Sequence, residues 1–338
     1  MVRIGIIGCG GMGRMHSQAC RAVGAAQLIA VADERLEKAK ELADKTGCQC
    51  EASPADLLRR DDIEAVMICT PTTSHHPLAM QALSAGKHVF SEKPLARTLA
   101  LAEELVAKVR SSGKFAQVGH VLRFWPEYLY LKKALEEKRW GKLILIKLGR
   151  FCAQPSWAEN NWYIDPAVSG GAALDLHLHD TDMVHFLFGK PKAVFSRGVN
   201  DVTGWIHLLT HYDFPNGPAV HAEGTWYNAE KYAFRMFFVA AFEGGTLDYD
   251  CSRNPMLVFY PQKGEAVEPE LSKPVMTEVG EGINISDLGG YLLQDQYFFE
   301  CLEAGKAPVV ATFADGRDAL ATVEAEIRSA ETREWVSV

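Results

Sequence analysis

The sequence contains no long uncharged apolar run, no run of basic residues and no C-x-x-C pair. Without an apolar run of bilayer length, we expect no membrane-spanning segment. The formal net charge of −8 and the absence of a Lys/Arg run argue against nucleic acid or an anionic membrane as the main partner. The chain also shows no internal repeat, no low-complexity segment and no signal-peptide pattern.

The eight cysteines are scattered rather than grouped. None has a zinc-ligand spacing, and the His and Asp spacings do not repeat as a ligand set, so we predict no metal site. A chain of 338 residues does not depend on a disulfide scaffold. We therefore expect reduced thiols and a cytoplasmic location.

The first 33 residues follow the strand–glycine loop–helix–strand pattern of a dinucleotide-binding unit. Gly8-Cys9-Gly10-Gly11-Met12-Gly13 fits G-x-G-x-x-G, and Asp33 lies 20 residues after Gly13, where the second strand ends. In this pattern the first glycine makes a tight turn, the second lets the backbone approach a pyrophosphate, and the third allows close helix packing. The helix N-terminus supplies N–H groups and partial positive charge to the phosphates.

The acidic residue at the end of the second strand indicates which dinucleotide binds. Asp33 can accept hydrogen bonds from a ribose 2′-OH but would repel a 2′-phosphate, so we predict NAD rather than NADP. Arg35 acts in the opposite direction, because an arginine can bind that phosphate.

Strands and helices continue to alternate to about residue 121, which predicts a doubly wound parallel sheet of the Rossmann type. Polar groups follow three of these strands, at Thr70-Pro71-Thr72, Glu92-Lys93-Pro94 and Gly119-His120. Ligands of such sheets bind beyond the carboxyl ends of the strands. We therefore expect these groups to converge on one crevice.

The pattern changes in the second part of the chain, where consecutive strand-like segments replace the alternation. Pro215-Asn216-Gly217 between two of them predicts a hairpin turn. We predict an α+β domain with an open, mostly antiparallel sheet and helices on one face. The predicted domains are 1–121, which binds NAD, and 122–338, which binds substrate and forms oligomers; the C-terminal helix can pack back on the first domain.

A helix predicted from about Leu174 to Phe188 carries a candidate acid–base pair. Asp175 and His179 are four residues apart and share one helix face. A carboxylate beside an imidazole suits proton transfer. The alternative is a solvated polar helix face without chemistry.

These motifs together resemble the Gfo/Idh/MocA family, named after glucose–fructose oxidoreductase and inositol dehydrogenase. The resemblance covers nearly the whole chain. Its motifs are Gly8–Gly13 with Asp33, Cys69–Thr72 with His75, the Glu-Lys-Pro segment Ala85–Ala96, Arg123-Phe124 with Pro126, and Trp162–Asp180. It implies a Rossmann domain followed by an α/β domain whose sheet often mediates oligomers.

The resemblance also implies a catalytic trio of Lys93, Asp175 and His179. His179 is the expected base, Lys93 stabilises developing alkoxide charge, and Asp175 orients the substrate or keeps Lys93 charged. The expected cofactor-binding residues are Gly8, Gly10, Gly11, Met12, Gly13, Asp33, Arg35, Thr70, Pro71, Thr72, His75, Glu92, Lys93, Trp162, Tyr163 and Tyr291. The expected substrate-binding residues are Lys93, Arg123, Trp157, Tyr163, Asp175 and His179.

Some residues depart from the family pattern or allow two interpretations. Ala172 stands where a third glycine is usual, and His177 where the family often has a small residue. His177 either lines the substrate pocket or is a surface histidine, and we expect the surface position. His185 and His207 are expected to be structural. The aromatic and Asn residues of 157–163 suit a polyhydroxylated, uncharged ligand, but also packing at a domain junction.

We expect an NAD-dependent dehydrogenase of a sugar or cyclic polyol, such as an inositol. The alternatives are a keto-sugar or aldehyde reductase, an NAD-assisted hydrolase or lyase, and a non-catalytic NAD-binding regulator. We further predict a homodimer or homotetramer formed through the sheet of the second domain. If helices cover one sheet face, the other would present apolar side chains, for which Phe195, Trp205, Phe237 and Phe242 are candidates.

Overall fold

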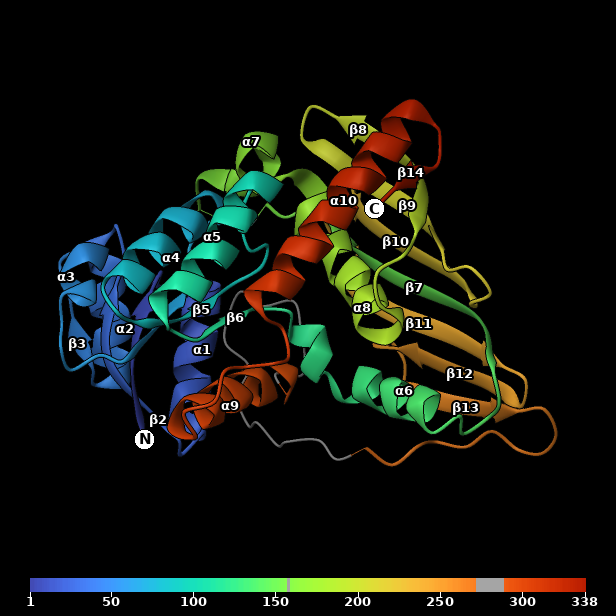
Figure 1. Ribbon diagram of the computed structural model, residues 1–338, viewed down its shortest axis with the longest axis horizontal. Coiled ribbons are helices and arrows are strands. Elements are labelled where there is room, and N and C mark those ends of the chain that lie inside the picture. The colour runs from blue at the N-terminus through green and yellow to red at the C-terminus, as the bar shows by residue number, and fades with distance from the viewer. Residues whose placement is uncertain (157–158, 272–288) are drawn as a thin grey trace. The chain divides into compact units, whose positions relative to one another are not determined.

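The computed structural model describes residues 1–156, 159–271 and 289–338 (Figure 1). These residues form two compact units. The first comprises Met1–Phe124 and the described part of Pro274–Arg317, and the second comprises the described part of Trp125–Lys273 and Asp318–Val338. The chain therefore returns to the first unit before it ends in the second.

The first unit is built on a parallel sheet, as the sequence predicts. Its six strands within the described residues have the order β3-β2-β1-β4-β5-β6. They are β1 (Val2–Ile7), β2 (Ala26–Ala32), β3 (Gln49–Cys50), β4 (Ala65–Ile68), β5 (His88–Ser91) and β6 (Ala116–Val118). Every neighbouring pair is parallel. The strand order reverses between β1 and β4, which is where doubly wound sheets bind ligands.

Helices cover this sheet and supply its core. They are α1 (Gly11–Ala22), α2 (Leu36–Thr46), α3 (Pro54–Leu58), α4 (His75–Ser84), α5 (Leu99–Ser112) and α9 (Gly289–Glu303), with 3₁₀ turns η1 (Thr72–Ser74) and η2 (Val121–Phe124). Phe298 and Phe299 of α9 are fully buried in one apolar cluster with Ile4 and Ile6 of β1. The late helix α9 is therefore part of the core of the first unit, beside α1.

The second unit is built on a large open sheet. Among the described residues its eight strands have the order β13-β12-β11-β7-β10-β9-β8-β14. They are β7 (Leu143–Ala153), β8 (Ala193–Asp201), β9 (Gly204–Asp213), β10 (Ala219–Tyr227), β11 (Arg235–Phe242), β12 (Gly245–Asp250), β13 (Leu257–Pro261) and β14 (Val336–Ser337). Only the β10–β7 pairing is parallel, so the mostly antiparallel sheet is confirmed.

Helices lie over one face of this sheet (Figure 1). They are α6 (Pro126–Glu136), α8 (Leu178–Phe188) and α10 (Phe313–Thr332); the shorter turns are η3 (Glu159–Ile164), α7 (Pro166–Ser169) and η4 (Ala173–His177). Tyr128 of α6, for example, packs edge-on against Phe238, with ring centroids 5.2 Å apart. The hairpin predicted at 215–217 joins β9 to β10, and Gly217 donates its N–H to the Phe214 carbonyl at 2.8 Å.

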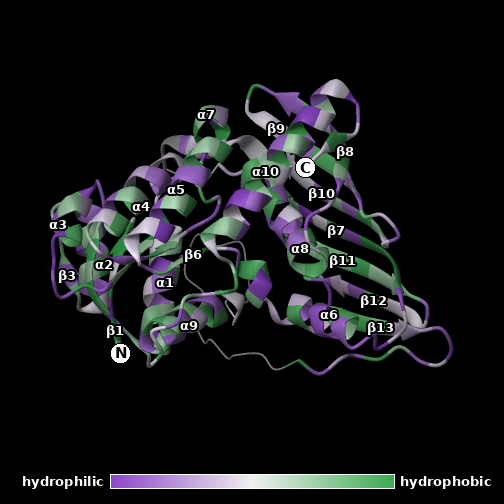
Figure 2. Cartoon of the chain, in the orientation of Figure 1, coloured by the Kyte–Doolittle hydropathy of each residue, from purple (hydrophilic) through white to green (hydrophobic). Residues whose placement is uncertain are grey.

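The other face of the sheet is less apolar than the sequence suggested. Alternate residues of β11 point to opposite sides, so Phe242 shares the side of Phe238, which packs on Tyr128 of α6, and it does not belong to the other face. Its ring centroid lies 5.3 Å from that of Trp140. Phe237 lies 5.0 Å from the Arg235 guanidinium and 5.7 Å from the Lys147 ammonium. Hydrophobic and hydrophilic residues both occur along these strands (Figure 2).

The predicted helix over 174–188 begins differently from the prediction. Its first turn, Ala173–His177, is a π-helix, and regular α-helix begins only at Leu178. π turns are rare and often occur at functional sites. No helix of the described segments is long and apolar enough to cross a membrane.

Candidate functional site

The loop after β1 has four glycines, and the three of the G-x-G-x-x-G pattern have different surroundings. Gly8 has a φ of +97°, and a Cβ there would lie 2.6 Å from the Cys69 carbonyl oxygen. A Cβ on Gly13 would lie 1.9 Å from the Gly8 carbonyl oxygen. A Cβ on Gly10 would meet no atom within 4 Å. Packing requires Gly8 and Gly13, whereas Gly10 faces open space at the N-terminus of α1, as the dinucleotide pattern requires of its second glycine.

The carboxylate of Asp33 is held beside this loop. Its Oδ2 accepts the backbone N–H of Cys9 at 2.7 Å, and its Oδ1 accepts that of Arg35 at 3.0 Å. Basic groups lie close by: burial lowers the pKa of Lys38, and the charges of Arg35 and Arg14 lower it further. The acidic residue predicted to bind the adenosine ribose is thus fixed at the end of β2, with cations around it.

The end of β4 leaves a polar group for a ligand. The Thr70 hydroxyl is buried and has no hydrogen-bond partner among the described residues. His75, by contrast, bridges two segments: Nδ1 lies 2.7 Å from the Pro94 carbonyl and Nε2 lies 2.8 Å from the Thr70 carbonyl. Burial lowers the pKa of His75, although its hydrogen bonds with the Pro94 and Thr70 carbonyl oxygens act in the opposite direction. His75 therefore connects the end of β4 to the segment that follows Lys93.

Glu92, just before the candidate lysine, belongs to a buried charge cluster. Its Oε1 lies 2.9 Å from His16 Nε2, and Asp295 Oδ2 lies 2.8 Å from His16 Nδ1. Burial opposes the charge on the ring, but the carboxylates of Asp295 and Glu92 outweigh it and raise the pKa of His16 to about 10. The backbone N–H of Lys93 donates to Glu92 Oε2 at 3.1 Å.

The candidate acid–base pair of the second unit reaches solvent where its neighbours do not. In the segment 171–184, which spans the π turn and much of α8, every residue is buried except Asp175 and His179. The two side chains that sequence reasoning selected are therefore the two polar groups that this segment presents. A purely solvated helix face would expose more of its residues.

His177 is not a surface residue, so that expectation is wrong. Its side chain is 0% exposed, and Nε2 lies 3.0 Å from Glu326 Oε2. Thr181 donates to Glu326 at 3.1 Å and lies 3.1 Å from the Tyr212 hydroxyl. Burial disfavours the charged ring, but Glu326 raises the pKa of His177. The polar ring is tolerated inside because a carboxylate on α10 pairs with it.

The other predicted site residues differ in their surroundings: some pack against aromatic rings and one forms an ion pair. Trp162 and Tyr163 stack with ring centroids 3.9 Å apart, and Tyr163 meets Trp226 edge-on at 6.2 Å. Arg123 is 5% exposed and pairs with Asp315 at 3.1 Å, which suits a structural anchor. The Tyr291 ring lies 6.4 Å from the His16 ring. Trp157 lies outside the described residues.

The histidines expected to be structural have partners in the fold. His185 Nε2 lies 2.9 Å from the Thr322 hydroxyl, and His207 Nδ1 lies 2.7 Å from the Thr225 hydroxyl. The eight cysteines, all in described residues, are free thiols. No group of three or more His, Cys, Asp or Glu side chains in the described residues is arranged to hold a metal ion.

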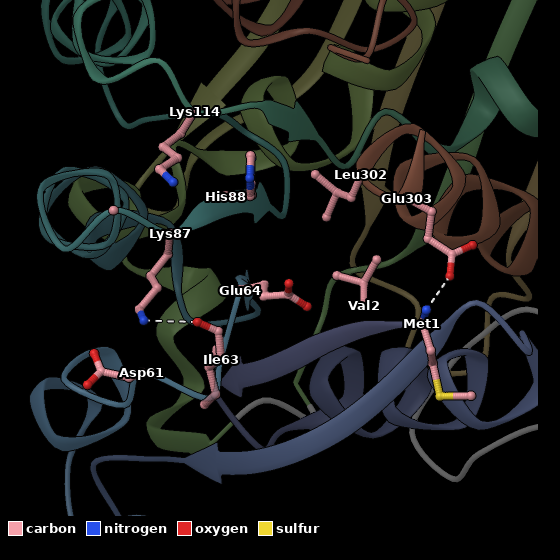
Figure 3. Close-up of a pocket in the computed structure, with 11 residues that line it drawn as sticks. Met1, Val2, Asp61, Ile63, Glu64, Lys87, His88, Lys114, Leu302 and Glu303 are labelled. Carbon is pink, nitrogen blue, oxygen red and sulfur yellow. Dashed lines mark hydrogen bonds and ion pairs between the residues drawn. The ribbon is translucent and has the colours of Figure 1, made fainter. Parts of the chain in front are cut away.

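One hollow of the first unit lies away from these residues (Figure 3). It has a volume of about 570 Å³ and is lined by residues at the beginnings of β1, β4 and β5, among them Val2, Glu64 and His88. The glycine loop follows the carboxyl end of β1 instead. The hollow mixes Lys87 and Lys114 with Asp61 and Glu303 and does not coincide with the dinucleotide edge.

Sequence reasoning missed His16, Asp295 and Glu326. His16 is the third residue after Gly13, and this spacing on the dinucleotide helix was available as a signal. Asp295 is 279 positions from His16, and Glu326 is also far from its partner His177 in sequence, by 326 − 177 = 149 positions. No local sequence pattern predicts pairs of residues that are so far apart in the chain.

The fold and the glycine loop define a dinucleotide-binding protein, and comparisons identify its family. Residues 2–120 match the model described as "Oxidoreductase family, NAD-binding Rossmann fold", and residues 128–248 match the "GFO/IDH/MocA C-terminal domain". The chain belongs to the Gfo/Idh/MocA family. It is an NAD-dependent oxidoreductase, as the sequence predicts.

Among similar proteins is inositol 2-dehydrogenase of Rhizobium meliloti (strain 1021), 28% identical over 349 aligned positions that cover 100% of this chain and 99% of that protein. Myo-inositol 2-dehydrogenase of Thermotoga maritima is 31% identical over 199 residues, 58% of each chain. A structure of levoglucosan dehydrogenase with NADH and levoglucosan has a TM-score of 0.87, covers 100% of this chain and 99% of that chain, and is 23% identical. That structure establishes the likeness of the fold alone.

Proposed function

We propose that the protein transfers a hydride between NAD and a hydroxyl or keto carbon of a sugar or cyclic polyol, with an inositol-like ring as the first candidate. The names of the inositol dehydrogenase relatives support this substrate class. The observation that carries the proposal is that Asp175 and His179 are partly exposed in an otherwise buried segment. An acid–base pair must reach its substrate, whereas a binding protein needs no such pair.

The residues divide the work as follows. The loop Gly8–Gly13, Asp33 and the Thr70–Thr72 segment hold the cofactor, and Arg35, His75, Glu92, Trp162, Tyr163 and Tyr291 complete its surroundings. NAD, when bound, supplies the hydride acceptor. His179 removes the hydroxyl proton. Lys93 hydrogen-bonds the reacting oxygen and stabilises its developing charge. Asp175 orients the substrate.

Substrate contacts and cellular context complete the proposal. Tyr163 offers a ring face to the C–H face of a sugar, and Arg123 supports the site from its ion pair with Asp315. Trp157, which lies outside the described residues, remains a proposed substrate contact. We assign 1–121 to cofactor binding and 122–338 to substrate binding and assembly, except for α9, which is part of the core of the first unit. We place the protein in the cytoplasm. The same groups would serve the alternative activities, which are reduction of a keto-sugar and internal redox in a hydrolase or lyase.

A panel of polyols and sugars with NAD separates these activities. We expect net NADH absorbance with at least one cyclic polyol or aldose. Product formation without net NADH indicates internal redox, and NADH consumption with a keto-sugar indicates reduction as the working direction. If neither NADH nor product forms with any member, while NAD still binds, the protein is a regulator and the proposal is wrong.

We also propose that the chain forms a homodimer or homotetramer through the open face of its eight-stranded sheet. Phe195 and Phe237 belong to this mixed face, where Lys147 and Glu223 form an ion pair at 3.4 Å. Light scattering at micromolar concentration should give a mass of two or four chains. Phe237→Asp, which introduces a charge on the face, should lower that mass, whereas the matched change Val202→Asp at an exposed turn should not. A monomer mass for the natural protein would exclude the proposal.

A further inference from the structure

A buried histidine connects the dinucleotide helix to the segment that carries Lys93. His16 lies on α1, in the turn after Gly13, and its side chain is 0% exposed. One ring nitrogen faces Asp295 on α9, at 2.8 and 3.0 Å from its two carboxylate oxygens. The other faces Glu92 at the end of β5, at 2.9 Å. All three residues belong to the first unit.

The arrangement defines the charge of the ring. An ionised carboxylate can only accept hydrogen bonds, so both ring nitrogens must donate, which requires the imidazolium form. The pair of carboxylates raises the pKa of His16 to about 10 although burial opposes the charge. Buried charges persist only when they are paired, and removal of one partner leaves the others uncompensated. The three side chains therefore act as one unit.

Glu92, which the His16 ring holds in place, also contacts the backbone of the next residue, Lys93. Its second oxygen, Oε2, accepts the backbone N–H of Lys93 at 3.1 Å. The same carboxylate lies against Gly119, where a Cβ would come within 3.0 Å of it. The carboxylate is thus held by His16, by the Lys93 backbone and by the close approach of Gly119. A change in its orientation would break its hydrogen bond with the backbone N–H of Lys93.

We propose that His16 is a positioning residue for hydride transfer: its ring fixes Glu92, and Glu92 fixes the backbone from which Lys93 reaches the reacting oxygen. The inference rests on the proposed function, in which Lys93 stabilises that oxygen. Because His16 lies on the helix whose N-terminus faces the pyrophosphate, the same contact ties the lysine segment to the cofactor-binding helix. A role in stability alone would not make the effect of His16 depend on Lys93.

A double-mutant cycle tests this dependence. His16→Gln keeps a donor toward Glu92 but removes the charge and the contact with Asp295. We expect it to lower kcat by up to about 10²-fold, the effect of misplacing a reacting group by an ångström, and to change the Kd for NAD by less than about threefold. Lys93→Ala should lower kcat by about 10²–10⁴-fold. The double variant should match Lys93→Ala within about twofold, because coupled residues are not additive.

The control is His76→Gln, which removes an exposed histidine–carboxylate pair of the same kind, His76–Glu104 at 2.9 Å; its kcat should equal that of the natural protein. If His16→Gln does not fold, Asp295→Asn, which removes one charge without removing an atom from the chain, enters the same cycle. An unchanged kcat, or a double variant whose loss is the product of the two single losses, overturns the inference. A normal kcat for Lys93→Ala overturns the proposed function itself, whatever His16 does.

Discussion

At the scale of single residues, the proposed chemistry depends on two side chains. Removal of a general base or an electrostatic stabiliser costs about 10²–10⁴-fold in rate. We expect His179→Ala and Lys93→Ala to lower kcat by that order on the best substrate, while the Kd for NAD changes little for His179→Ala. Asp175→Asn should lie between these variants and the natural protein, because an amide still forms hydrogen bonds. Steady-state kinetics with NAD titration measures both quantities.

The pH–rate profile gives a second measurement of the same prediction. The base must be neutral to accept the proton, so kcat/KM should fall on the acid side, where the base becomes protonated. His179→Ala should lose this acid limb as well as the rate. A near-normal kcat with an unchanged acid limb would show that His179 is not the base. The partly exposed side chains of Asp175 and His179 would then form a polar helix face without chemistry.

Asp33 carries the residue-scale prediction about the cofactor. Asp33→Ala removes an acceptor for the ribose and for the Cys9 N–H, which lies 2.7 Å away. Hydrogen bonds to a charged group are worth about 1.5–3 kcal/mol, so NAD affinity should fall by about ten- to a hundredfold. The preference for NAD over NADP should narrow, because the positive charges of Arg14, Arg35 and Lys38 remain near residue 33.

Fluorescence titrations of both cofactors at fixed salt measure this change. Asp33→Asn is the matched variant: it keeps an acceptor for the Cys9 N–H and removes only the charge, so it should narrow the preference with a smaller loss of NAD affinity. Tighter binding of NADP than NAD by the natural protein contradicts the assignment.

At the scale of the elements, the glycine loop and α1 make opposite predictions at two neighbouring glycines. Gly13→Ala forces a Cβ to within 1.9 Å of the Gly8 carbonyl and should destabilise the fold by about 1–3 kcal/mol. Gly10 has a φ of −73°, which any residue adopts, and its Cβ would meet no atom within 4 Å. Gly10→Ala should therefore leave stability within about 0.5 kcal/mol but weaken NAD binding at least about tenfold.

Denaturant unfolding and NAD titration of the two variants separate the effects. Unchanged NAD affinity in Gly10→Ala would show that the backbone at Gly10 does not approach the cofactor. Equal stability of Gly13→Ala and the natural protein would mean that α1 can shift from the loop, against the close packing that the structure shows.

The elements also show what the sequence alone could predict. Local spacing is enough for the glycine loop and for Asp175 with His179, since those residues lie within one or two turns of each other. It does not predict the π turn at Ala173–His177, because this departure from α-helix accompanies the burial of His177 against Glu326, a partner on α10. The sequence does not predict the pairing of His16 with Asp295 for the same reason. The two residues are 279 positions apart, and only the packing of α9 beside α1 brings them together.

At the scale of the whole molecule, the buried imidazolium of His16 links stability to pH. The pKa of His16 is about 10 in the fold and about 6.5 in an unfolded chain. A group whose pKa is raised by folding contributes stability that is complete below pH 6.5 and is lost as the pH rises toward 10. His177, whose pKa Glu326 also raises against the effect of burial, acts in the same direction.

The test compares the free energy of unfolding of His16→Gln with that of the natural protein between pH 6 and pH 10. The groups that face the ring are Asp295, whose pKa is raised by burial, and Glu92, whose pKa His16 lowers although burial opposes it; the thiol of Cys20 nearby has a pKa well above 9 because it is buried. The stability lost in His16→Gln should be largest at pH 6 and should shrink steadily toward pH 10. The exposed control His76→Gln should show a small difference that does not follow this course. A deficit for His16→Gln that is the same at both ends of the range would mean that the ring is not charged in the fold, and that its bonds to Asp295 and Glu92 form without the proton on which the positioning role depends.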